Sequence, residues 1–431
     1  MGLLAGGVWR PPGLGVPEYI SIGRLGPALG GTGWHLWTLA QHYDLTQDRQ
    51  WLVRIAPEVA RVCHWIVRQR EKTKRLGPRG EKLPEYGLMP PGVEADWNAM
   101  AYYFCLNGYF YAGLDNAGRV LGEIGHTDAP LLRRQACELK EEILRAFHHT
   151  QSLSPVLALR DGTWVPAYPS QVHCPGLTNG FYPGEDGNRS WCYDVEEGAP
   201  HLVPQGVLDA KSRDAAWMIH YLEDVQFLEE GWLFYPAKES QRDPFHLGGF
   251  SKVQPYLTRT AQMHALADDV KPFVRAYFNA AASVVNLETL ACSEHFAGLG
   301  ASTNSESMGH FLEQTRWMLV MERGEELWLA PLVTGNWLKD GMVVAVRNAP
   351  TRFGRASYRI HSSVARAFVT ITIEPPTRNP PGALVLRVRH PDGRPMTGVT
   401  VNGKPHPLFD KTAEIVRLPP SAQPITVVVR Y

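Results

Sequence analysis

The hydrophobic periodicity of this sequence changes near Gly324, and the change limits what the chain can fold into. Before Gly324, apolar residues recur at intervals of three and four; after it, apolar and polar residues alternate. Side chains on one face of a helix recur about every 3.6 residues, whereas those on one face of a strand recur every second residue. The sequence therefore predicts a mainly helical domain over 1–323 and a small all-β domain over 324–431.

The helical domain is predicted to consist of antiparallel helix pairs. Residues 27–70 read as two helices joined by a polar link at 44–48. Helices are also predicted from Trp97, through Met100, Ala101, Phe104 and Cys105, and over 131–147, 212–228, 270–285 and 305–322.

Long loops rich in aromatic residues, Gly and Pro separate the predicted helix pairs. This pattern is typical of an α/α toroid, a ring of helical hairpins whose loops form a binding site at one end. Only about eight helices are clear by periodicity, fewer than the twelve of a six-hairpin barrel. We therefore expect some hairpins of the toroid to be short, irregular or absent.

The C-terminal domain is predicted to be a β-sandwich. Turn-forming residues such as those at 391–393 and 402–403 separate alternating segments, as expected for short antiparallel strands. No cluster of catalytic residue types falls in this part of the chain. The strands are expected at 343–347, 356–360, 368–373, 384–389 and 425–430.

Charge and composition exclude several classes of protein. Forty-three basic residues balance forty-three acidic ones, so no global field exists to hold nucleic acid. No stretch of eighteen apolar residues occurs, and residues 1–12 lack the pattern of a signal peptide. We expect a soluble protein with no membrane partner, cytoplasmic or secreted from a longer precursor, and the oligomeric state stays open.

The six cysteines show no metal-binding or redox spacing. Three fall in helical patterns, where Cys acts as a small apolar residue. We interpret them as free thiols, with a Cys174–Cys192 disulfide left open for an oxidising compartment.

Aromatic residues point to a carbohydrate ligand. The 13 Trp and 16 Tyr residues gather in loops between predicted helices, where flat rings can stack on the C–H faces of sugars. Burial in the core is the alternative for any single one. The pattern favours an oligosaccharide or polysaccharide substrate.

Hydrolysis of a glycosidic bond needs two carboxyl groups, one protonated and one charged. Glu94 and Asp96 lie just before a predicted helix, in a loop that also carries Tyr86 and Trp97. This segment is the first candidate for one half of the pair. Asp96 could instead only cap the helix that follows it.

A second candidate segment contains Glu294 and His295, between two predicted helices and followed by Gly-rich chain. Glu294 is the second candidate carboxylate, and His295 could bind the substrate by a hydrogen bond. Thr303 and Glu306 have the spacing of a capping box, although Glu306 could also contact the substrate.

Two further segments could complete the binding site. Trp191 and Tyr193 lie in segment 182–194, whose clustered acidic residues do not have the spacing of a calcium-binding loop, so no metal is expected. Gln254 and Tyr256 add an amide and a ring. No dinucleotide, P-loop, zincin or serine-hydrolase motif occurs, and no cofactor is expected.

Four segments together resemble bacterial six-hairpin glycosidase-like proteins, and WLKDGMVVAVRNAPTRFGRASYRI resembles their closing β-module. The resemblance implies that Glu94 or Asp96, together with Glu294, borders the pocket. The resemblance also implies an upstream β-domain, which we do not expect within the short region before the first predicted helix of this sequence. The segments are YGLMPPGVEADW, the run SWCYDVEEG through HLVPQGVLDAKSRDAAWMIHYLEDVQFLEEGW, FSKVQPYLTRTAQMHALADDVKPFVRAYFNAAASV and SEHFAGLGASTNSESMGHFLEQTRWMLVMERGEELWLAP.

The leading hypothesis is an exo-acting glycoside hydrolase of plant or microbial glycans. Asp96 or Glu94 would be its general acid and Glu294 its base or nucleophile, with the stereochemical course open. A polysaccharide lyase is the first alternative, with Tyr193 or His295 as base and Arg189 neutralising a uronate carboxylate. A glycan-binding protein without activity is the second.

Overall fold

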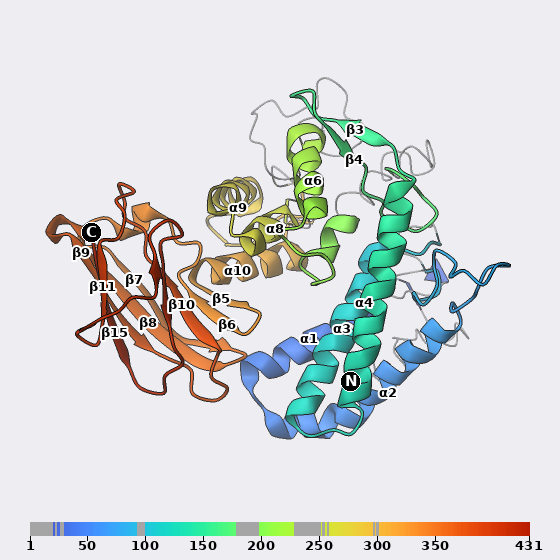
Figure 1. The fold of residues 1–431 in the computed structure, drawn as a ribbon, viewed down its shortest axis with the longest axis horizontal. Helices are drawn as coiled ribbons and strands as arrows, with labels where there is room; N and C mark the ends of the chain where they lie inside the picture. The colour runs from blue at the N-terminus through green and yellow to red at the C-terminus, as the bar shows by residue number, and fades with distance from the viewer. Residues whose placement is uncertain are drawn as a thin grey trace. The chain divides into compact units, whose positions relative to one another are not determined.

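The computed structural model describes residues 20–21, 24–25, 30–92, 100–177, 198–227, 251, 255–256, 258–295, 298 and 301–431. The chain forms two compact units, one of Met1–Tyr43 and Asp48–His310, the other of Asp44–Gln47 and Phe311–Tyr431. The first is mainly helical and the second is built mainly from strands (Figure 1). A helical N-terminal part and a β-sandwich-like C-terminal part are therefore both present, as the change of periodicity indicated.

The longer helices account for most of the described residues of the first unit. They are α1 (Gly30–Thr46), α2 (Arg49–Glu71), α3 (Phe104–Glu123), α4 (Ala129–Ser152), α6 (Arg213–Tyr221), α8 (Thr260–Ala267), α9 (Val270–Val284) and α10 (Ser305–Leu319), which continues into the second unit. Shorter elements are the hairpins β1 (Ile20–Ser21) with β2 (Arg24–Leu25) and β3 (Val156–Ala158) with β4 (Trp164–Pro166), the 3₁₀ turn η2 (Ala199–Leu202) and the π turn η3 (Leu222–Gln226).

Both helices of the first predicted pair are present. Helices α1 and α2 are separated by only two residues, and the carboxylate of Asp48 accepts a hydrogen bond of 2.9 Å from the N–H of Trp51. This bond satisfies one of the donors that a helix N-terminus leaves unpaired. Helix α2 then buries the apolar face that its sequence pattern predicted, from Leu52 to Ile66.

The predicted helix at Trp97 begins later than expected. Helix α3 starts at Phe104, and Ala101 instead exchanges backbone hydrogen bonds of 2.9 and 3.0 Å with Gly92. Tyr103 pairs in the same extended manner with Gln171. The helical spacing of Met100 and Ala101 was coincidental, because pairing with distant backbone outweighed local propensity. Trp97 itself lies outside the described residues.

Glycines let α1 and α3 cross at very short distance. A Cβ added at Gly33 would lie 2.6 Å from the backbone nitrogen of Phe110, and one at Gly113 would lie 2.5 Å from the carbonyl oxygen of Gly33. Neither site has room for a methyl group, since real Cβ contacts are not that short. The crossing fixes the residues that follow Gly33 in α1 against α3.

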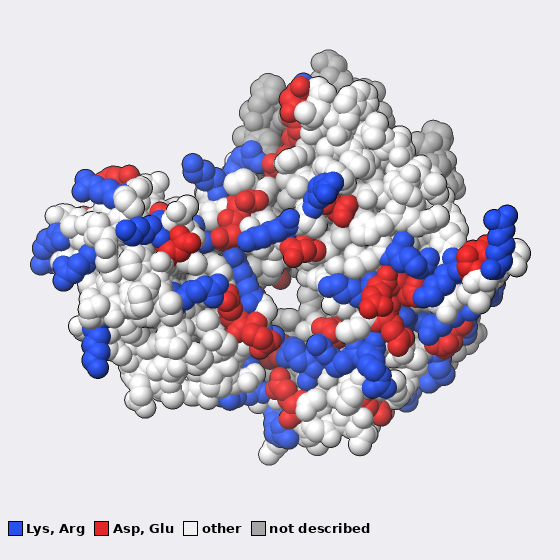
Figure 2. All heavy atoms as spheres, in the orientation of Figure 1, with Lys and Arg blue, Asp and Glu red and all other residues white. Residues whose placement is uncertain are grey.

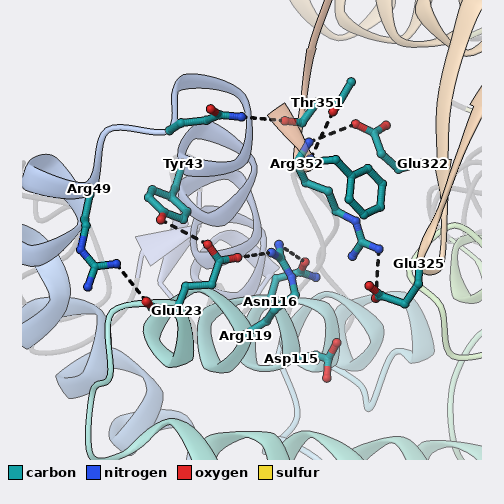
Figure 3. Close-up of polar contacts among 12 residues, drawn as sticks. Tyr43, Arg49, Asp115, Asn116, Arg119, Glu123, Glu322, Glu325, Thr351 and Arg352 are labelled. Carbon is teal, nitrogen blue, oxygen red and sulfur yellow. Dashed lines mark hydrogen bonds and ion pairs between the residues drawn. The ribbon is translucent and has the colours of Figure 1, made fainter. Parts of the chain in front are cut away.

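Polar contacts hold the C-terminal end of α3 against α1 and α2 (Figure 3). The hydroxyl of Tyr43, on α1, donates to the Glu123 carboxylate at 3.2 Å. Arg49, on α2, donates to the backbone carbonyl of Glu123 at 2.9 Å. The core between these helices is apolar and includes Leu36, Phe104, Leu114 and Phe147, each at most 1% exposed.

The second unit contains two sheets. One has the order β13-β14-β10-β6-β5, and the other has the order β12-β11-β15-β9-β8-β7. The strands are β5 (Val320–Arg323), β6 (Glu326–Leu329), β7 (Val343–Thr351), β8 (Gly354–Ser363), β9 (Phe368–Glu374), β10 (Ala383–Arg387), β11 (Gly398–Val401), β12 (Lys404–Pro405), β13 (Phe409–Asp410), β14 (Ile415–Leu418) and β15 (Ile425–Arg430).

Side chains from both sheets form one apolar core. Leu386 of β10 and Ile371 of β9 are fully buried in the same cluster, as is Val427 of β15. Alternating burial along β8 and β15 accounts for the period of two in the sequence. All five predicted strands are present within a residue or a few of their expected ends.

Two features of this unit differ from expectation. The last predicted helix ends at Leu319 rather than at 322, because 320–323 pair with 326–329 as strands β5 and β6. Strand β6 also pairs with β10 in parallel, a long-range contact that short-range periodicity does not reveal.

Charges of both signs are mixed over the helical unit on the face drawn in Figure 2, in keeping with the balanced composition. Among the described residues, no helix is both long and apolar enough to cross a bilayer.

Candidate functional site

A buried arginine is the centre of a polar cluster in the helical unit. Arg259 is 5% exposed and immediately precedes α8. Its Nη2 donates to the hydroxyl of Tyr109 at 3.3 Å, and its Nε donates to Nδ1 of His201 at 3.4 Å. Its Nη1 donates to the imidazole of His310 and, at 3.5 Å, to Oε1 of Gln262. Residues far apart in sequence thus meet at one guanidinium.

Four different elements place these five side chains. Tyr109 lies in α3, His201 in η2 and His310 in α10, while Arg259 and Gln262 belong to the start of α8. A buried hydrogen bond of 3.0 Å from the Gln205 amide to the carbonyl of Cys105 joins the turn after η2 to α3. The cluster is therefore held by helix packing.

The tautomer of His201 follows from its contacts. A guanidinium can only donate, so Nδ1 of His201 acts as an acceptor toward Arg259. The same Nδ1 lies 3.1 Å from the hydroxyl of Tyr109, and the ring proton of a neutral His201 is then on Nε2.

An aromatic stack extends from the cluster toward solvent. The ring of Trp34, on α1, lies 5.4 Å from the ring of Tyr109 and within 8° of parallel, and Trp37 contacts the same tyrosine at 6.3 Å. Trp34 is 42% exposed although it is among the most apolar of side chains. The close crossing at Gly33 sets this geometry, since a wider separation of α1 and α3 would part the two rings.

Two carboxylates act on each other beside Arg259. Glu306 is half-buried in the first turn of α10, four residues before His310 and therefore on the same helix face. Burial raises the pKa of Glu306, and the negative charge of Glu294 raises it further, while Arg259 opposes both effects. Glu306 thus keeps its proton to higher pH than an ordinary glutamate.

Glu306 does not belong to the expected capping box. The side chain of Asn304, and not Thr303, caps α10, because its oxygen accepts a 2.7 Å hydrogen bond from the N–H of Ser307. The cap therefore lies one residue later than the sequence pattern suggested, and Glu306 is not at the position that would bond back to it. The capping role proposed for Glu306 is wrong.

Glu294 lies in a short closed loop before α10. Its N–H donates to the carbonyl of Ala301 at 3.0 Å, and its carboxylate accepts from the N–H of Ala301 at 3.1 Å. The imidazole of His295 lies 3.8 Å from the same carboxylate. Glu294 is 30% and His295 18% exposed at the side chain, so both remain accessible from solvent.

Two other predicted site residues lie elsewhere in the fold. Tyr86 is partly exposed in a loop held by Arg145 and contacts the ammonium of Lys82 through its ring. Tyr256 is fully buried, and burial raises the pKa of its phenol, as do the neighbouring Tyr277 and Cys292. Six predicted residues lie outside the described part of the chain: Glu94, Asp96, Trp97, Trp191, Tyr193 and Gln254, and the lyase candidate Arg189 lies there as well.

Sequence reasoning missed most of the cluster. Tyr109 and Trp34 fit the apolar faces of their helices, so their periodicity indicated only packing. His201 and Arg259 do not belong to any recognisable sequence motif. The one available signal was the four-residue spacing of Glu306 and His310 in a predicted helix.

Within the described ranges, no group of three or more His, Cys, Asp or Glu side chains is arranged to hold a metal ion. The cluster offers proton donors and acceptors, one fixed cation and an exposed ring. These are the groups that binding and acid–base chemistry on a sugar require.

The sequence matches no protein family, and no curated protein matches it either. Among solved structures, it is similar to an α-L-rhamnosidase from Dictyoglumus thermophilum, with 10% identity and a TM-score of 0.48, over 94% of this chain and 40% of that one. A family GH78 rhamnosidase of Bacillus sp. GL1 gives 12% identity and a TM-score of 0.40, over 77% of this chain and 31% of that one.

A third similar structure is a metal-independent α-mannosidase of Streptococcus pneumoniae with α-1,6-mannobiose, at 11% identity and a TM-score of 0.37, over 67% of both chains. The structural neighbours are thus glycoside hydrolases of low identity. This chain spans less than half the length of either rhamnosidase.

Proposed function

We propose that this protein is a glycoside hydrolase whose active site is the Arg259 cluster together with Glu294 and Glu306. The observation that carries the proposal is that two carboxylates interact beside a group of hydrogen-bonding side chains, one of which stacks on an exposed tryptophan. Glycosidic hydrolysis needs a protonated acid and a charged carboxylate across one sugar. The substrate is an oligosaccharide or polysaccharide, attacked from its end.

The two glutamates suit different roles. Glu306 is the candidate acid that donates a proton to the departing glycosidic oxygen, because burial raises its pKa, with the charge of Glu294 adding to this effect and Arg259 opposing it. Glu294 is more exposed to solvent and is the candidate base that activates water, or the nucleophile. Glu94 and Asp96 are the rival candidates for the acid.

Trp34 is the proposed sugar platform. One face of its ring stacks on Tyr109 and the residue is 42% exposed, so a pyranose can stack on the remaining surface without further ordering of the ring. We also propose that the helix pairs of this unit belong to an α/α toroid.

The test is hydrolysis of a panel of aryl glycosides by wild type and by Glu294→Gln, Glu306→Gln, Glu94→Gln and Asp96→Asn. Removing the acid or the base is expected to lower kcat by about 10²-fold or more. Glu288→Gln, an exposed glutamate near Glu294 in sequence, is the matched control and should retain full activity. Full activity in both Glu294→Gln and Glu306→Gln would overturn the assignment.

A polysaccharide lyase is the second candidate, because Tyr109, His201 and Arg259 form a hydrogen-bonded group. A lyase needs a Tyr or His base beside a cation that neutralises a uronate carboxylate. Its product would contain a double bond and absorb in the ultraviolet. Such a product from a uronate polymer would select this mechanism, and reducing sugar without absorbance would select hydrolysis.

A further inference from the structure

The balanced charge of the whole chain conceals an uneven distribution along it. Residues 324–431 contain 14 Lys and Arg against 7 Asp and Glu, whereas the rest of the chain has an acidic excess. Four of these seven acidic side chains each lie within ion-pair distance of an arginine of the same unit, which leaves the basic excess on other side chains. The four pairs are Arg352–Glu325, Arg389–Glu414, Arg394–Asp392 and Arg417–Glu326.

Part of the basic excess lies on one face of the six-stranded sheet. Residues of β8, β9 and β15, which are neighbours in this sheet, alternate between the apolar core of the sandwich and the opposite face (Figure 1). Arg355 and Arg359 of β8 and Arg430 of β15 are exposed on that opposite face. Arg366 lies over the ring of Phe368, which is paired with Arg430. We call the surface defined by these four arginines the arginine face.

Threonines occupy the arginine face between the cations. Arg359 is paired across the strands with Thr372, and Thr372 is paired in turn with Thr426. In the adjacent row, His361 is paired with Thr370. Paired residues of neighbouring strands point to the same side of a sheet. The face therefore presents rows of hydroxyl groups beside positive charges.

The spacing of the charges suits an extended anion. Glu374 is the one acidic residue among the strand positions of this face, all of which the structure describes, and it offsets one of the four charges. Arg430 is paired through Phe368 with Ser363, eight residues beyond Arg355. At about 3.4 Å per residue, the two arginines lie about 27 Å apart along the strands. A small anion cannot span that distance, whereas a polymer with repeated charges can.

We propose that the arginine face binds an acidic polysaccharide. Guanidinium groups form charge-assisted hydrogen bonds with carboxylates and other oxyanions. Threonine hydroxyls can both donate hydrogen bonds to sugar hydroxyls and accept them. The surface is distinct from the proposed active site, and the inference does not require the protein to hydrolyse the polymer that it binds.

Two other anionic partners fit the arginine face less well. Single-stranded nucleic acid is held by aromatic rings that stack on its bases, and Phe368 is the one Phe, Tyr or Trp among the described strand positions of this face. Arg366 already lies over that ring. Binding at a membrane surface buries apolar side chains among the lipids, whereas threonines occupy the centre of this face. The residues therefore favour a polysaccharide.

Binding of the full chain to heparin, polygalacturonate and uncharged dextran at low ionic strength tests the proposal. We expect both acidic polymers to bind, dextran not to bind, and the affinity for the acidic polymers to fall as salt is added. Absence of binding to both acidic polymers would overturn the proposal. Tighter binding of oligothymidylate or of phosphatidylserine vesicles would overturn it as well, because the partner would then belong to another class.

Paired variants assign the binding to this face. Arg359→Gln/Arg430→Gln removes two exposed charges and should weaken binding of the acidic polymers about tenfold or more. Arg359→Lys/Arg430→Lys keeps the charges and should weaken it less. The matched control is Lys411→Gln/Arg417→Gln, which removes the same charge from exposed positions in β14 and in the turn before it. Equal weakening in the control would overturn the assignment, because binding would then follow net charge alone.

The outcome is separable from that for the proposed function. Because Arg359 and Arg430 are exposed, their variants should unfold at the temperature of the wild type and hydrolyse aryl glycosides at the same rate. Binding of acidic polymers by a chain that hydrolyses no glycoside would support the arginine face and reject the hydrolase. Hydrolysis of aryl glycosides without binding of either acidic polymer would do the reverse.

Discussion

At the scale of single residues, the environment of Glu306 leads to a prediction about how the stability of the protein depends on pH. Its folded-state pKa is raised above that of the unfolded chain, so ionising it opposes folding. The penalty is absent at pH below the unfolded pKa, about 4.3, and grows as pH rises through and beyond that value. Glu306→Gln removes the ionisable group and should therefore unfold at a higher temperature than wild type near neutral pH.

Thermal unfolding measured between pH 4 and pH 8 checks this prediction. The difference in unfolding temperature between Glu306→Gln and wild type should shrink toward acid pH, where the wild-type carboxyl is protonated in both the folded and the unfolded state. Glu288→Gln, at an exposed position, should show no such trend. A variant less stable than wild type at neutral pH would mean that the charged carboxylate has a favourable partner.

Single residues also show what could be anticipated from sequence alone. The need for two carboxylates led to Glu294, which acts on Glu306 in the structure, whereas Glu306 was predicted either to contact the substrate or to close a capping box. Arg259 could not be found, because its significance depends on burial and on partners up to 150 residues away. Those are properties of tertiary packing, which no local pattern encodes.

At the scale of elements, the crossing of α1 and α3 supports the site. Gly33→Ala introduces a methyl group 2.6–2.7 Å from the backbone of Tyr109 and Phe110, which can be relieved only by moving one helix. We expect a loss of about 1–3 kcal/mol in stability, as for other overpacked cores. Sugar affinity should also fall, because the Trp34–Tyr109 stack is displaced.

Gly31→Ala is the matched control, two residues earlier in the same helix. Its methyl group would meet only the His35 ring at 3.5 Å, an ordinary contact, and alanine favours the helix by about 1 kcal/mol over glycine. Denaturant unfolding should therefore give opposite signs for the two variants. Equal effects would show that the close approach at Gly33 has no energetic consequence.

Elements were predicted well where periodicity alone decides the structure. Helices α2 and α9 and strands β8, β9 and β15 coincide closely with their patterns because each buries one regular face. The start of α3 and the end of α10 were misjudged, because backbone pairing with Gly92 and with β6 competes with the helix. Such competition involves distant partners and leaves no local signal.

At the scale of the whole molecule, the chain has two apolar cores made of different residues. Among the residues that the structure describes, one core contains residues of the helical unit, the other contains residues of the β-sandwich, and no residue belongs to both. Ile371→Ala, in the second core, is expected to cost about 3 kcal/mol. Calorimetry should show the transition of the β unit shifted to lower temperature.

Ligand binding at the Arg259 cluster should change the stability of the helical unit alone. A sugar bound at the Arg259 cluster should raise the transition of the helical unit by mass action. Its affinity should be the same in Ile371→Ala and in wild type below the first transition. Loss of sugar binding in that folded variant would show that the sandwich core is needed for the site.

The most direct measurement of the central claim is a crystal structure of the protein soaked with a mixture of neutral and acidic monosaccharides. The account predicts one ring stacked on Trp34, with its hydroxyls near Glu294 and Glu306. A sugar bound only at the β-sandwich, or none within reach of those glutamates, would contradict it.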